Sequence, residues 1–144
     1  MDWHYDDGGR ALAGFKGTTS DCVCRAIAIG TGMGYKEVYD LINEFAKKER
    51  ITKRNPKKSS ARTGVSMKTA HKVMAHLGWT WHPTMQIGSG CQVHLRDGEL
   101  PYGTVIVRVS RHFTCVIDGV VYDTFDCTRD GDRCVYGYYI KEEG

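Results

Sequence analysis

The chain has 144 residues, a length typical of one domain. Hydrophobic residues make up 41% and charged residues 26%, a globular composition that excludes wholesale disorder. Twenty Lys and Arg against 17 Asp and Glu leave a formal charge of +3, too small to indicate a class of partner. No apolar run approaches the roughly 18 residues of a membrane-spanning helix, and the polar, acidic first residues do not resemble a signal peptide. We therefore expect one domain, residues 1–144, located in the cytoplasm and without membrane contact.

Six cysteines are distributed along the chain, at positions 22, 24, 91, 115, 127 and 134. Because no export signal is visible, we expect thiols in a reducing compartment rather than disulfides. No C-x-x-C pair is present, and the histidines do not supply the matching half of a zinc motif. The sequence therefore predicts neither a metal nor any other cofactor.

The first third of the chain changes from irregular to helical. Residues 1–20 are rich in Gly, Asp and Thr and predict an irregular segment. Ser20 is a good N-cap for a short, apolar and therefore buried helix over residues 21–29, which Gly30 should end. A second helix over residues 35–48 is amphipathic, with apolar side chains at i, i+3, i+4 and i+7.

A basic segment follows, because residues 47–62 contain eight Lys or Arg and one Glu. Such a segment has no apolar face to bury, so we expect a mobile loop. Ser66 then caps a third helix that ends at Gly78.

The second half of the chain reads as strands. They are expected over residues 79–85, 104–109, 112–117, 120–124 and 135–140. Asp118-Gly119 is a strong signal for a two-residue β-hairpin turn between the third and fourth of these. Helices first and antiparallel strands later indicate an α+β fold, with N-terminal helices packed on a C-terminal antiparallel sheet.

Cys22 is a candidate nucleophile because it stands at the start of the buried helix. Free N–H groups and the positive end of the helix dipole favour a thiolate there, and the same N–H groups can hold an oxyanion. Cys24 points about 200° away around the helix, so we expect it in the core. A buried cysteine without chemistry is the alternative for Cys22 as well.

The predicted hairpin brings a base and an acid together. A two-residue turn at Asp118-Gly119 sets the register, which makes His112 and Asp123 diagonal neighbours on one face of the sheet. Asp126 falls on the opposite face. A histidine beside a cysteine is the usual base for a thiol nucleophile, and a carboxylate that orients the imidazole completes a triad.

Three segments also carry a resemblance. Residues 20–28 (SDCVCRAIA) resemble the cysteine motif of ovarian-tumour-type deubiquitinases and other papain-like peptidases. Residues 112–124 (HFTCVIDGVVYDT) resemble the histidine and acid hairpin of papain-like and bacteriocin-processing peptidases. The whole chain, with its opening YDDGGR…GFKG and the pair Asp21-Cys22, resembles a group of small phage and prophage proteins.

The resemblance implies a papain-like thiol hydrolase. Cys22 would be the nucleophile, His112 the base and Asp123 the residue that orients it, with cleavage of a peptide or isopeptide bond through a thioester, or amide transfer as a variant. In the family a side chain shortly before the cysteine completes the oxyanion hole, and the candidates here are Thr19 and Asp21. A protein or peptide would be the substrate, and a phage protein would act in the cytoplasm of its host.

Two other functions stay open from the sequence. The basic residues 47–62 could neutralise several phosphates of a nucleic acid, although no aromatic residues are interleaved with them. A papain-like scaffold could also serve as a binding protein without catalysis, since a fold does not determine a function. The oligomeric state is not indicated.

Overall fold

The computed structural model describes residues 1–86 and 88–141. The helices of this part are α1 (Cys22–Thr31), α2 (Tyr35–Ala46) and α3 (Met67–His76). The strands are β1 (Asp2–Tyr5), β2 (Trp79–Pro83), β3 (Val93–His94), β4 (Thr104–Val109), β5 (His112–Ile117), β6 (Val120–Asp123) and β7 (Cys134–Lys141). The predicted α+β class is confirmed, because three helices accompany one seven-stranded sheet.

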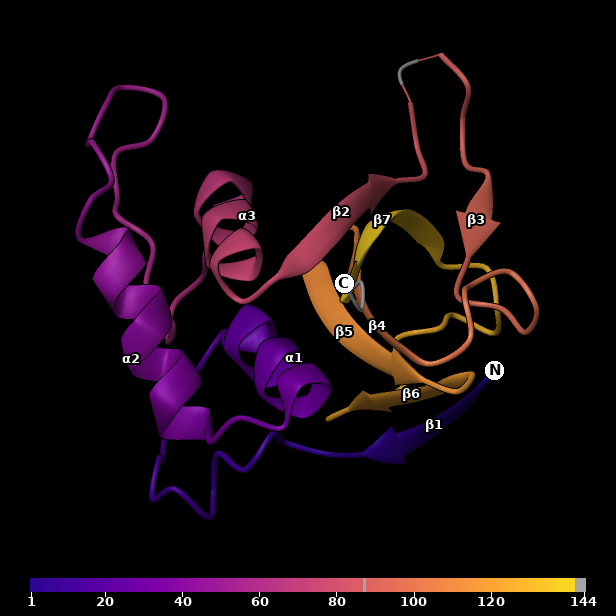
Figure 1. The fold of residues 1–144 in the computed structure, drawn as a ribbon, viewed down its shortest axis with the longest axis horizontal. Coiled ribbons are helices and arrows are strands. Elements are labelled where there is room, and N and C mark those ends of the chain that lie inside the picture. Colours follow the sequence, from indigo (N-terminus) through magenta and orange to yellow (C-terminus); the bar gives the residue numbers. More distant parts are fainter. Residues whose placement is uncertain (87, 142–144) are drawn as a thin grey trace.

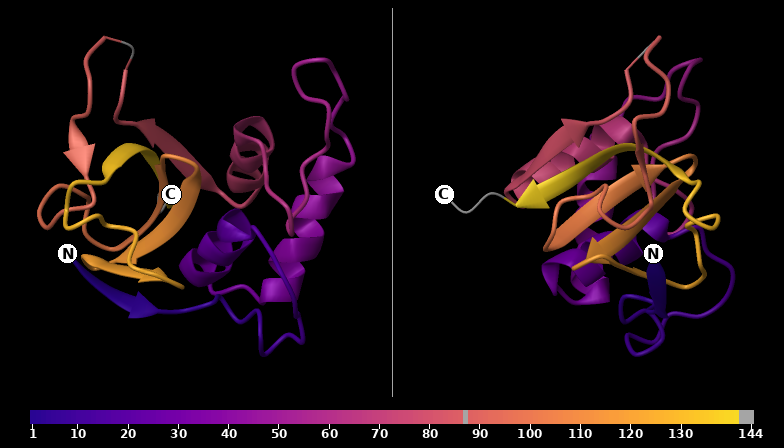
Figure 2. Two further views of the ribbon diagram at one scale, coloured as in Figure 1. Left: turned by 180° about the vertical axis from the view of Figure 1, so that it is seen from behind. Right: turned by 90° about the vertical axis from the view of Figure 1, so that its right-hand side faces the viewer.

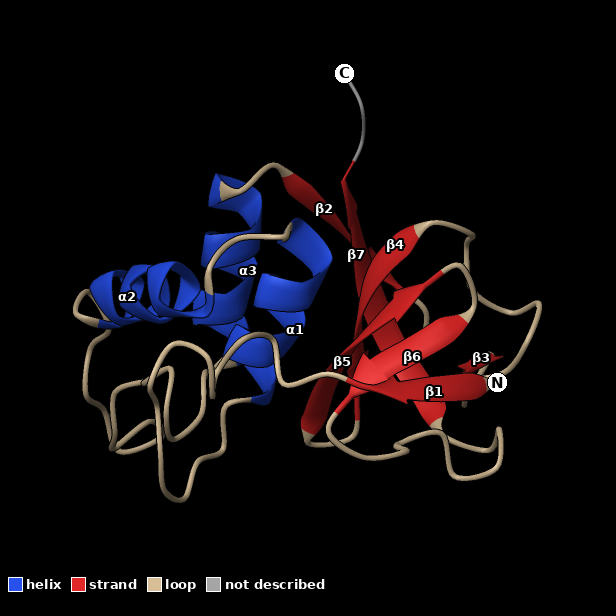
Figure 3. Ribbon diagram, turned by 90° about the horizontal axis from the view of Figure 1, so that it is seen from below, coloured by secondary structure: helices blue, strands red, loops and turns tan. Residues whose placement is uncertain are grey.

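Helices and sheet form two sides of the molecule (Figures 1 and 3). The helix α1 packs directly on β5 and separates the sheet from α2, while α3 lies against α2 and β2. One hydrophobic core fills the space between helices and sheet. The strongly curved sheet, seen from two further sides in Figure 2, encloses a second core on its other face. Both faces are therefore covered, which explains why β4 and β5 are apolar almost without alternation.

The strand order β1-β6-β5-β4-β7-β2 corrects two expectations. Residues 2–5 are not irregular: they form β1, which pairs in parallel with β6. The sheet is consequently mixed rather than antiparallel throughout. The short strand β3, which pairs with β7, was also not expected. Neither strand could be predicted from the residues around it, because each is formed by pairing with a strand that lies far away in the sequence.

The helix boundaries differ from the prediction at α1. Asp21, not Ser20, occupies the N-cap position, and the helix continues through Gly30 to the left-handed Gly32. Gly30 serves close packing, since a Cβ there would lie 2.8 Å from the Ile106 side chain on β4. The cap of α3 is confirmed, because the Ser66 hydroxyl accepts a hydrogen bond from the Thr69 N–H.

The register of the β5–β6 hairpin is confirmed. Residues 117 and 120, 116 and 121, and 115 and 122 are paired, as a two-residue turn requires. Asp118 and Gly119 both have positive φ values, 49° and 81°, which is the conformation of the type I′ turn.

The basic segment is a loop, as predicted, but one part of it is anchored. Ala61 is buried and its N–H donates to the Asn43 side chain on α2. The Ser59 N–H donates to Glu49, which also accepts a hydrogen bond from Thr69 on α3. The cations between residues 50 and 58 are exposed. The loop therefore has a fixed C-terminal end and an open basic tip.

The expectation of six free thiols is wrong for two of them. Cys91 and Cys134 form a disulfide, with their Cα atoms 5.9 Å apart. The pairing of β3 with β7 places His94 opposite Cys134 and so brings Cys91 within bonding range. The free cysteines are Cys22, Cys24, Cys115 and Cys127. Among the described residues, no helix is long and apolar enough to cross a membrane.

Candidate active site

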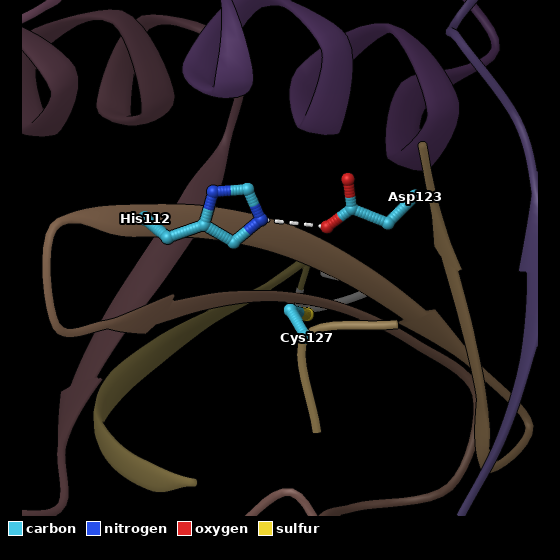
Figure 4. A group of neighbouring side chains, drawn as sticks. All are labelled: His112, Asp123 and Cys127. Atoms are coloured by element: carbon cyan, nitrogen blue, oxygen red, sulfur yellow. Dashed lines mark hydrogen bonds and ion pairs between the residues drawn. The ribbon is translucent and has the colours of Figure 1, made fainter. Parts of the chain in front are cut away.

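The predicted partnership of histidine and acid is present at one end of the β5–β6 hairpin. His112 is the first residue of β5, directly after a tight turn from β4, and Asp123 is the last residue of β6. The His112 Nε2 atom lies 2.6 Å from the Asp123 Oδ2 atom, and both side chains are buried (Figure 4). The shared face that the register predicted is therefore confirmed.

Cys22 meets this pair from the helix side. It is the first residue of α1, it is half-buried, and it lines the same two surface hollows as His112. Burial raises the pKa of the Cys22 thiol, but the interactions with His112, with the Phe113 backbone and with the charge of Arg25 outweigh it, so the pKa lies below its ordinary value.

The charges of the pair support each other. Burial lowers the pKa of His112, but the hydrogen bonds to Asp123, Cys127 and Cys22 raise it far above its usual value, to about 11. Burial raises the pKa of Asp123, but the hydrogen bond and charge of His112 and the charge of Arg25 bring it down to about 2. The lowered pKa of the Cys22 thiol and the raised pKa of the His112 imidazole both favour a thiolate beside an imidazolium.

Arg25 holds the acid in place. Its Nη2 atom lies 3.0 Å from Asp123 Oδ1, which leaves Oδ2 facing His112. Its Nη1 atom lies 2.6 Å from Asp21 Oδ1, four residues earlier on the same helix. The guanidinium thus bridges two buried carboxylates and ties the start of α1 to the end of β6. We call Cys22, His112, Asp123 and Arg25 the cleft group.

Thr19 and Asp21, the two residues expected to complete the oxyanion hole, are hydrogen-bonded to other groups. The Asp21 carboxylate is buried and accepts hydrogen bonds from Arg25 and from the Tyr35 hydroxyl at 2.6 Å. The Thr19 hydroxyl donates to the Arg62 carbonyl. Neither side chain is a free donor: the Thr19 hydroxyl proton is used in this hydrogen bond, and the Asp21 carboxylate is an acceptor that anchors α1. The available donors are the backbone N–H groups of the first turn of α1, which starts without a side-chain cap.

Cys24 lies in the core, as predicted. Its exposure is 0%, and its sulfur contacts the Tyr35 carbonyl at 3.7 Å. Burial raises the pKa of its thiol to about 12, helped by the charge of Asp21. Cys22 and Cys24 are two residues apart on one helix, yet the pKa of the first thiol is lowered and that of the second is raised.

The cleft group opens onto two adjoining hollows in the surface. One, of about 300 Å³, is lined by Thr19, Arg25 and Phe125, and the other, of about 260 Å³, by Gly64, Val65 and Phe113. Cys22, His112 and Arg111 line both hollows. An extended chain that runs from one hollow into the other therefore passes over the sulfur.

Cys127 lies below the pair in Figure 4, and the possible ligand atoms of His112, Asp123 and Cys127 are all within 4.8 Å of one another. A tetrahedral metal would hold its ligand atoms roughly 3.3 Å apart. His112 and Asp123 are instead in direct hydrogen-bond contact at 2.6 Å, and the second oxygen of Asp123 contacts Arg25. This arrangement fits a hydrogen-bonded pair and not a metal site.

A second cluster with a cysteine, a histidine, an acidic residue and an arginine lies around β3. Cys91 Sγ is 3.5 Å from His94 Nε2, and His94 Nδ1 is 3.1 Å from Glu99 Oε1. Arg96 contacts the same carboxylate at 3.3 Å. The sulfur of Cys91 is bonded to Cys134, and the group is partly exposed, with Arg96 at 49% and Glu99 at 26% exposure. We call Cys91, His94, Glu99 and Arg96 the β3 group.

Three side chains at the site were not expected from the sequence: Arg25, Arg111 and Cys127. Arg25 could have been found, since it is the lone cation in an apolar helix and follows Asp21 by four residues. Arg111 has a left-handed backbone, with φ of 54°, in the turn that precedes His112. No local pattern marks Cys127, which reaches the site only through the fold.

Comparisons with models of protein families, with curated proteins and with solved structures give no match for this chain.

Proposed function

We propose that the chain is a papain-like thiol hydrolase that cleaves a peptide or isopeptide bond. The observation that carries this proposal is one imidazole that is hydrogen-bonded to a buried carboxylate and lies in the same cleft as a free thiol. His112 bonds to Asp123, and it lines the same two hollows as Cys22, the first residue of α1. That is the arrangement needed to keep a thiolate and a proton donor side by side.

The first chemical step follows from this arrangement. The Cys22 thiolate attacks the carbonyl carbon of the substrate and forms a tetrahedral oxyanion, which the N–H groups at the start of α1 stabilise. The oxyanion then re-forms the carbonyl, the carbon–nitrogen bond breaks, and the His112 imidazolium gives its proton to the departing amine. A Cys22 thioester and a neutral imidazole remain.

The second step reverses these roles. Neutral His112 takes a proton from a water molecule, whose oxygen attacks the thioester carbonyl. The carbon–sulfur bond breaks, so that the carboxylic acid leaves and the thiolate–imidazolium pair is restored. Asp123 remains ionised throughout and keeps the ring oriented. With an amine in place of water, the same step is an amide transfer.

Reaction of Cys22 with iodoacetamide tests the nucleophile. Native protein is labelled at pH 7, and the modified sites are mapped by mass spectrometry over time. We expect Cys22 to react at least about tenfold faster than Cys24, Cys115 and Cys127, which are buried. Equal and slow labelling of all four thiols would refute a nucleophilic site and favour a binding protein.

Digestion of a peptide pool tests the reaction itself. Native protein and the Cys22→Ala variant are incubated with peptides from a protein digest and with peptides that contain a lysine isopeptide bond. New termini that appear only with the native protein support hydrolysis. A reactive Cys22 that forms thioesters but releases product only when an amine is added would instead indicate transfer.

A further inference from the structure

We infer that the substrate is an acidic peptide, with a carboxylate beside the cleaved bond that Arg111 binds. This inference rests on the proposed function, because it concerns what the cleft of Cys22 receives. It follows from the charge and the continuity of the cleft.

The cleft continues beyond the two hollows at Cys22. A third hollow of about 620 Å³ shares Thr63, Gly64 and Val65 with the hollow of about 260 Å³. The three hollows therefore form one groove, which runs from Phe125, past Cys22, to the tip of the basic loop. A groove of this form suits an extended chain rather than a small molecule.

Cations line the groove along its whole length: Arg25, Arg108, Arg111, Lys57 and Lys58. Asp21 is the only carboxylate that lines it among the described residues, and this group is buried and paired with Arg25. At the centre, the imidazolium of His112 is balanced by the Asp123 carboxylate, so the cations of the groove without a carboxylate partner in the described part of the chain are Arg108, Arg111, Lys57 and Lys58. A groove with one sign of charge concentrates ligands of the opposite sign.

Arg111 is the cation placed to bind the ligand. It is exposed, it lines both hollows at Cys22, and it makes no hydrogen bond or ion pair within residues 1–86 and 88–141. By contrast, Arg25 is occupied by two carboxylates, and the Nε atom of Arg108 donates to the Val109 carbonyl. At the far end of the groove Lys57 is likewise exposed and unpaired in the described part of the chain.

The groove favours an acidic peptide over a nucleic acid. Single-stranded nucleic acids are bound by successive aromatic faces as well as by cations. Of the aromatic side chains that line the groove, Phe125 is exposed, whereas Phe113 is 3% exposed and covered by Arg108. A peptide carboxylate needs no such stacking surface and matches the planar fork of an arginine.

The test compares a neutral and an anionic reagent at the same sulfur. Iodoacetamide and iodoacetate differ in charge and form the same carbon–sulfur bond, with loss of iodide. We expect the ratio of the iodoacetate rate to the iodoacetamide rate to be higher at Cys22 than at glutathione. In Arg111→Gln the iodoacetate rate should fall by about three- to tenfold, with a much smaller change for iodoacetamide.

Two controls and a salt series accompany this variant. Arg111→Lys should keep most of the iodoacetate rate, and Lys72→Gln should keep all of it, because Lys72 is an exposed cation on α3 outside the groove. High salt should slow iodoacetate more than iodoacetamide in the native protein, which tests the inference without any substitution.

The substrate itself is tested with peptide pools. Cleaved peptides should be enriched in Asp or Glu beside the new terminus, and Arg111→Gln should lose this preference. Peptides with an amidated C-terminus separate a side-chain carboxylate from a terminal one, since only the former survives amidation.

The outcomes are distinct. If Cys22 is unreactive to iodoacetamide, the proposed function fails, and this inference fails with it. If Cys22 reacts fast but shows no preference for iodoacetate and no effect of Arg111→Gln, the inference alone is overturned. It is also overturned if a single-stranded oligonucleotide protects Cys22 from iodoacetate at lower concentrations than polyglutamate does, because the groove then binds nucleic acid.

Discussion

The cleft group and the β3 group each combine a cysteine, a histidine, an acidic residue and an arginine, but they differ in burial. In the cleft group the histidine and the carboxylate are 2.6 Å apart and the carboxylate side chain is 1% exposed. In the β3 group the same contact measures 3.1 Å and the carboxylate is 26% exposed. The supporting arginine is 10% exposed beside Asp123 but 49% exposed beside Glu99.

This difference in burial explains why similar contacts favour catalysis in the cleft group and not in the β3 group. In water an ion pair gains little, because solvent screens the charges and competes for the hydrogen bonds. The hydrogen bond with His94 lowers the pKa of Glu99. In the cleft, where water is largely excluded, the shifts are large: the pKa of His112 rises to about 11 and that of Asp123 falls to about 2. The sulfur of the β3 group is also committed to a disulfide, whereas that of Cys22 is free. Burial and a free thiol, rather than the choice of residues, distinguish the candidate active site.

Removal of the sulfur from each group should give the sharpest contrast. Cys22→Ala should reduce peptide turnover by about 10³-fold or more, because no thioester can form. Its thermal midpoint should stay within about 3 °C of the native value, since a half-buried thiol contributes little packing. The double variant Cys91→Ala, Cys134→Ala should keep its turnover. A loss of turnover in the double variant, with none in Cys22→Ala, would place the chemistry in the β3 group.

Neutralisation of the two carboxylates should give the next largest difference. Asp123→Asn should reduce turnover by about 10²- to 10⁴-fold, because the imidazole loses the group that orients it and stabilises its charge. Glu99→Gln should change turnover less than twofold. Asp126→Asn is a second control, since Asp126 is exposed and contacts only Thr128 among the described residues. NMR titration of His112 should show its pKa fall in Asp123→Asn alone.

Replacement of each arginine by lysine should have a smaller effect on turnover. A lysine in place of Arg25 has one ammonium group and cannot bridge Asp21 and Asp123 together. We expect Arg25→Lys to lose about 1–3 kcal/mol of unfolding free energy in urea and about tenfold in turnover. Arg96→Lys should leave turnover within twofold, because water replaces the contact with Glu99. Equal effects of the two substitutions would mean that burial does not set the strength of these bridges.

The pH dependence should separate the two cysteines of α1 most finely. The pKa of Cys22 is lowered and that of His112 is raised to about 11, so the thiolate–imidazolium pair exists between these two values. Turnover should rise as Cys22 loses its proton below the ordinary thiol pKa, and fall as His112 loses its proton in the alkaline range. Cys24, whose pKa is raised by burial to about 12, should be alkylated only at a higher pH than Cys22. If the alkylation rates of the two cysteines had the same pH dependence, the expected difference between their thiol pKa values would be refuted.

Acid should also weaken the fold through Asp123. Its pKa in the folded state is about 2, below the ordinary value of 3.8, so its ionised form stabilises the folded state. This stabilisation is complete above about pH 4 and is lost as the pH falls towards 2. His112 behaves in the opposite sense, since its raised pKa adds stability that is complete below about pH 6.5 and declines as the pH rises.

Local patterns in the sequence determined several features of this protein. The Asp118-Gly119 turn set the hairpin register and with it the pairing of His112 and Asp123. The period of apolar residues defined α2, and Ser66 marked the start of α3. Each of these features depends on residues close together in the chain, where backbone sterics and the spacing of side chains leave few alternatives.

Only the tertiary structure decided the remaining features. The parallel pairing of β1 with β6, the Cys91–Cys134 disulfide and the bridge from Arg25 to Asp123 join residues that are far apart in the sequence. Asp21 was a candidate for an oxyanion, but its contacts with Arg25 and Tyr35 commit it to anchoring α1. The cationic groove combines side chains from the loops before α3, before β5 and after β6. Such contacts depend on which surfaces meet when the chain folds, and no local pattern of residues specifies them.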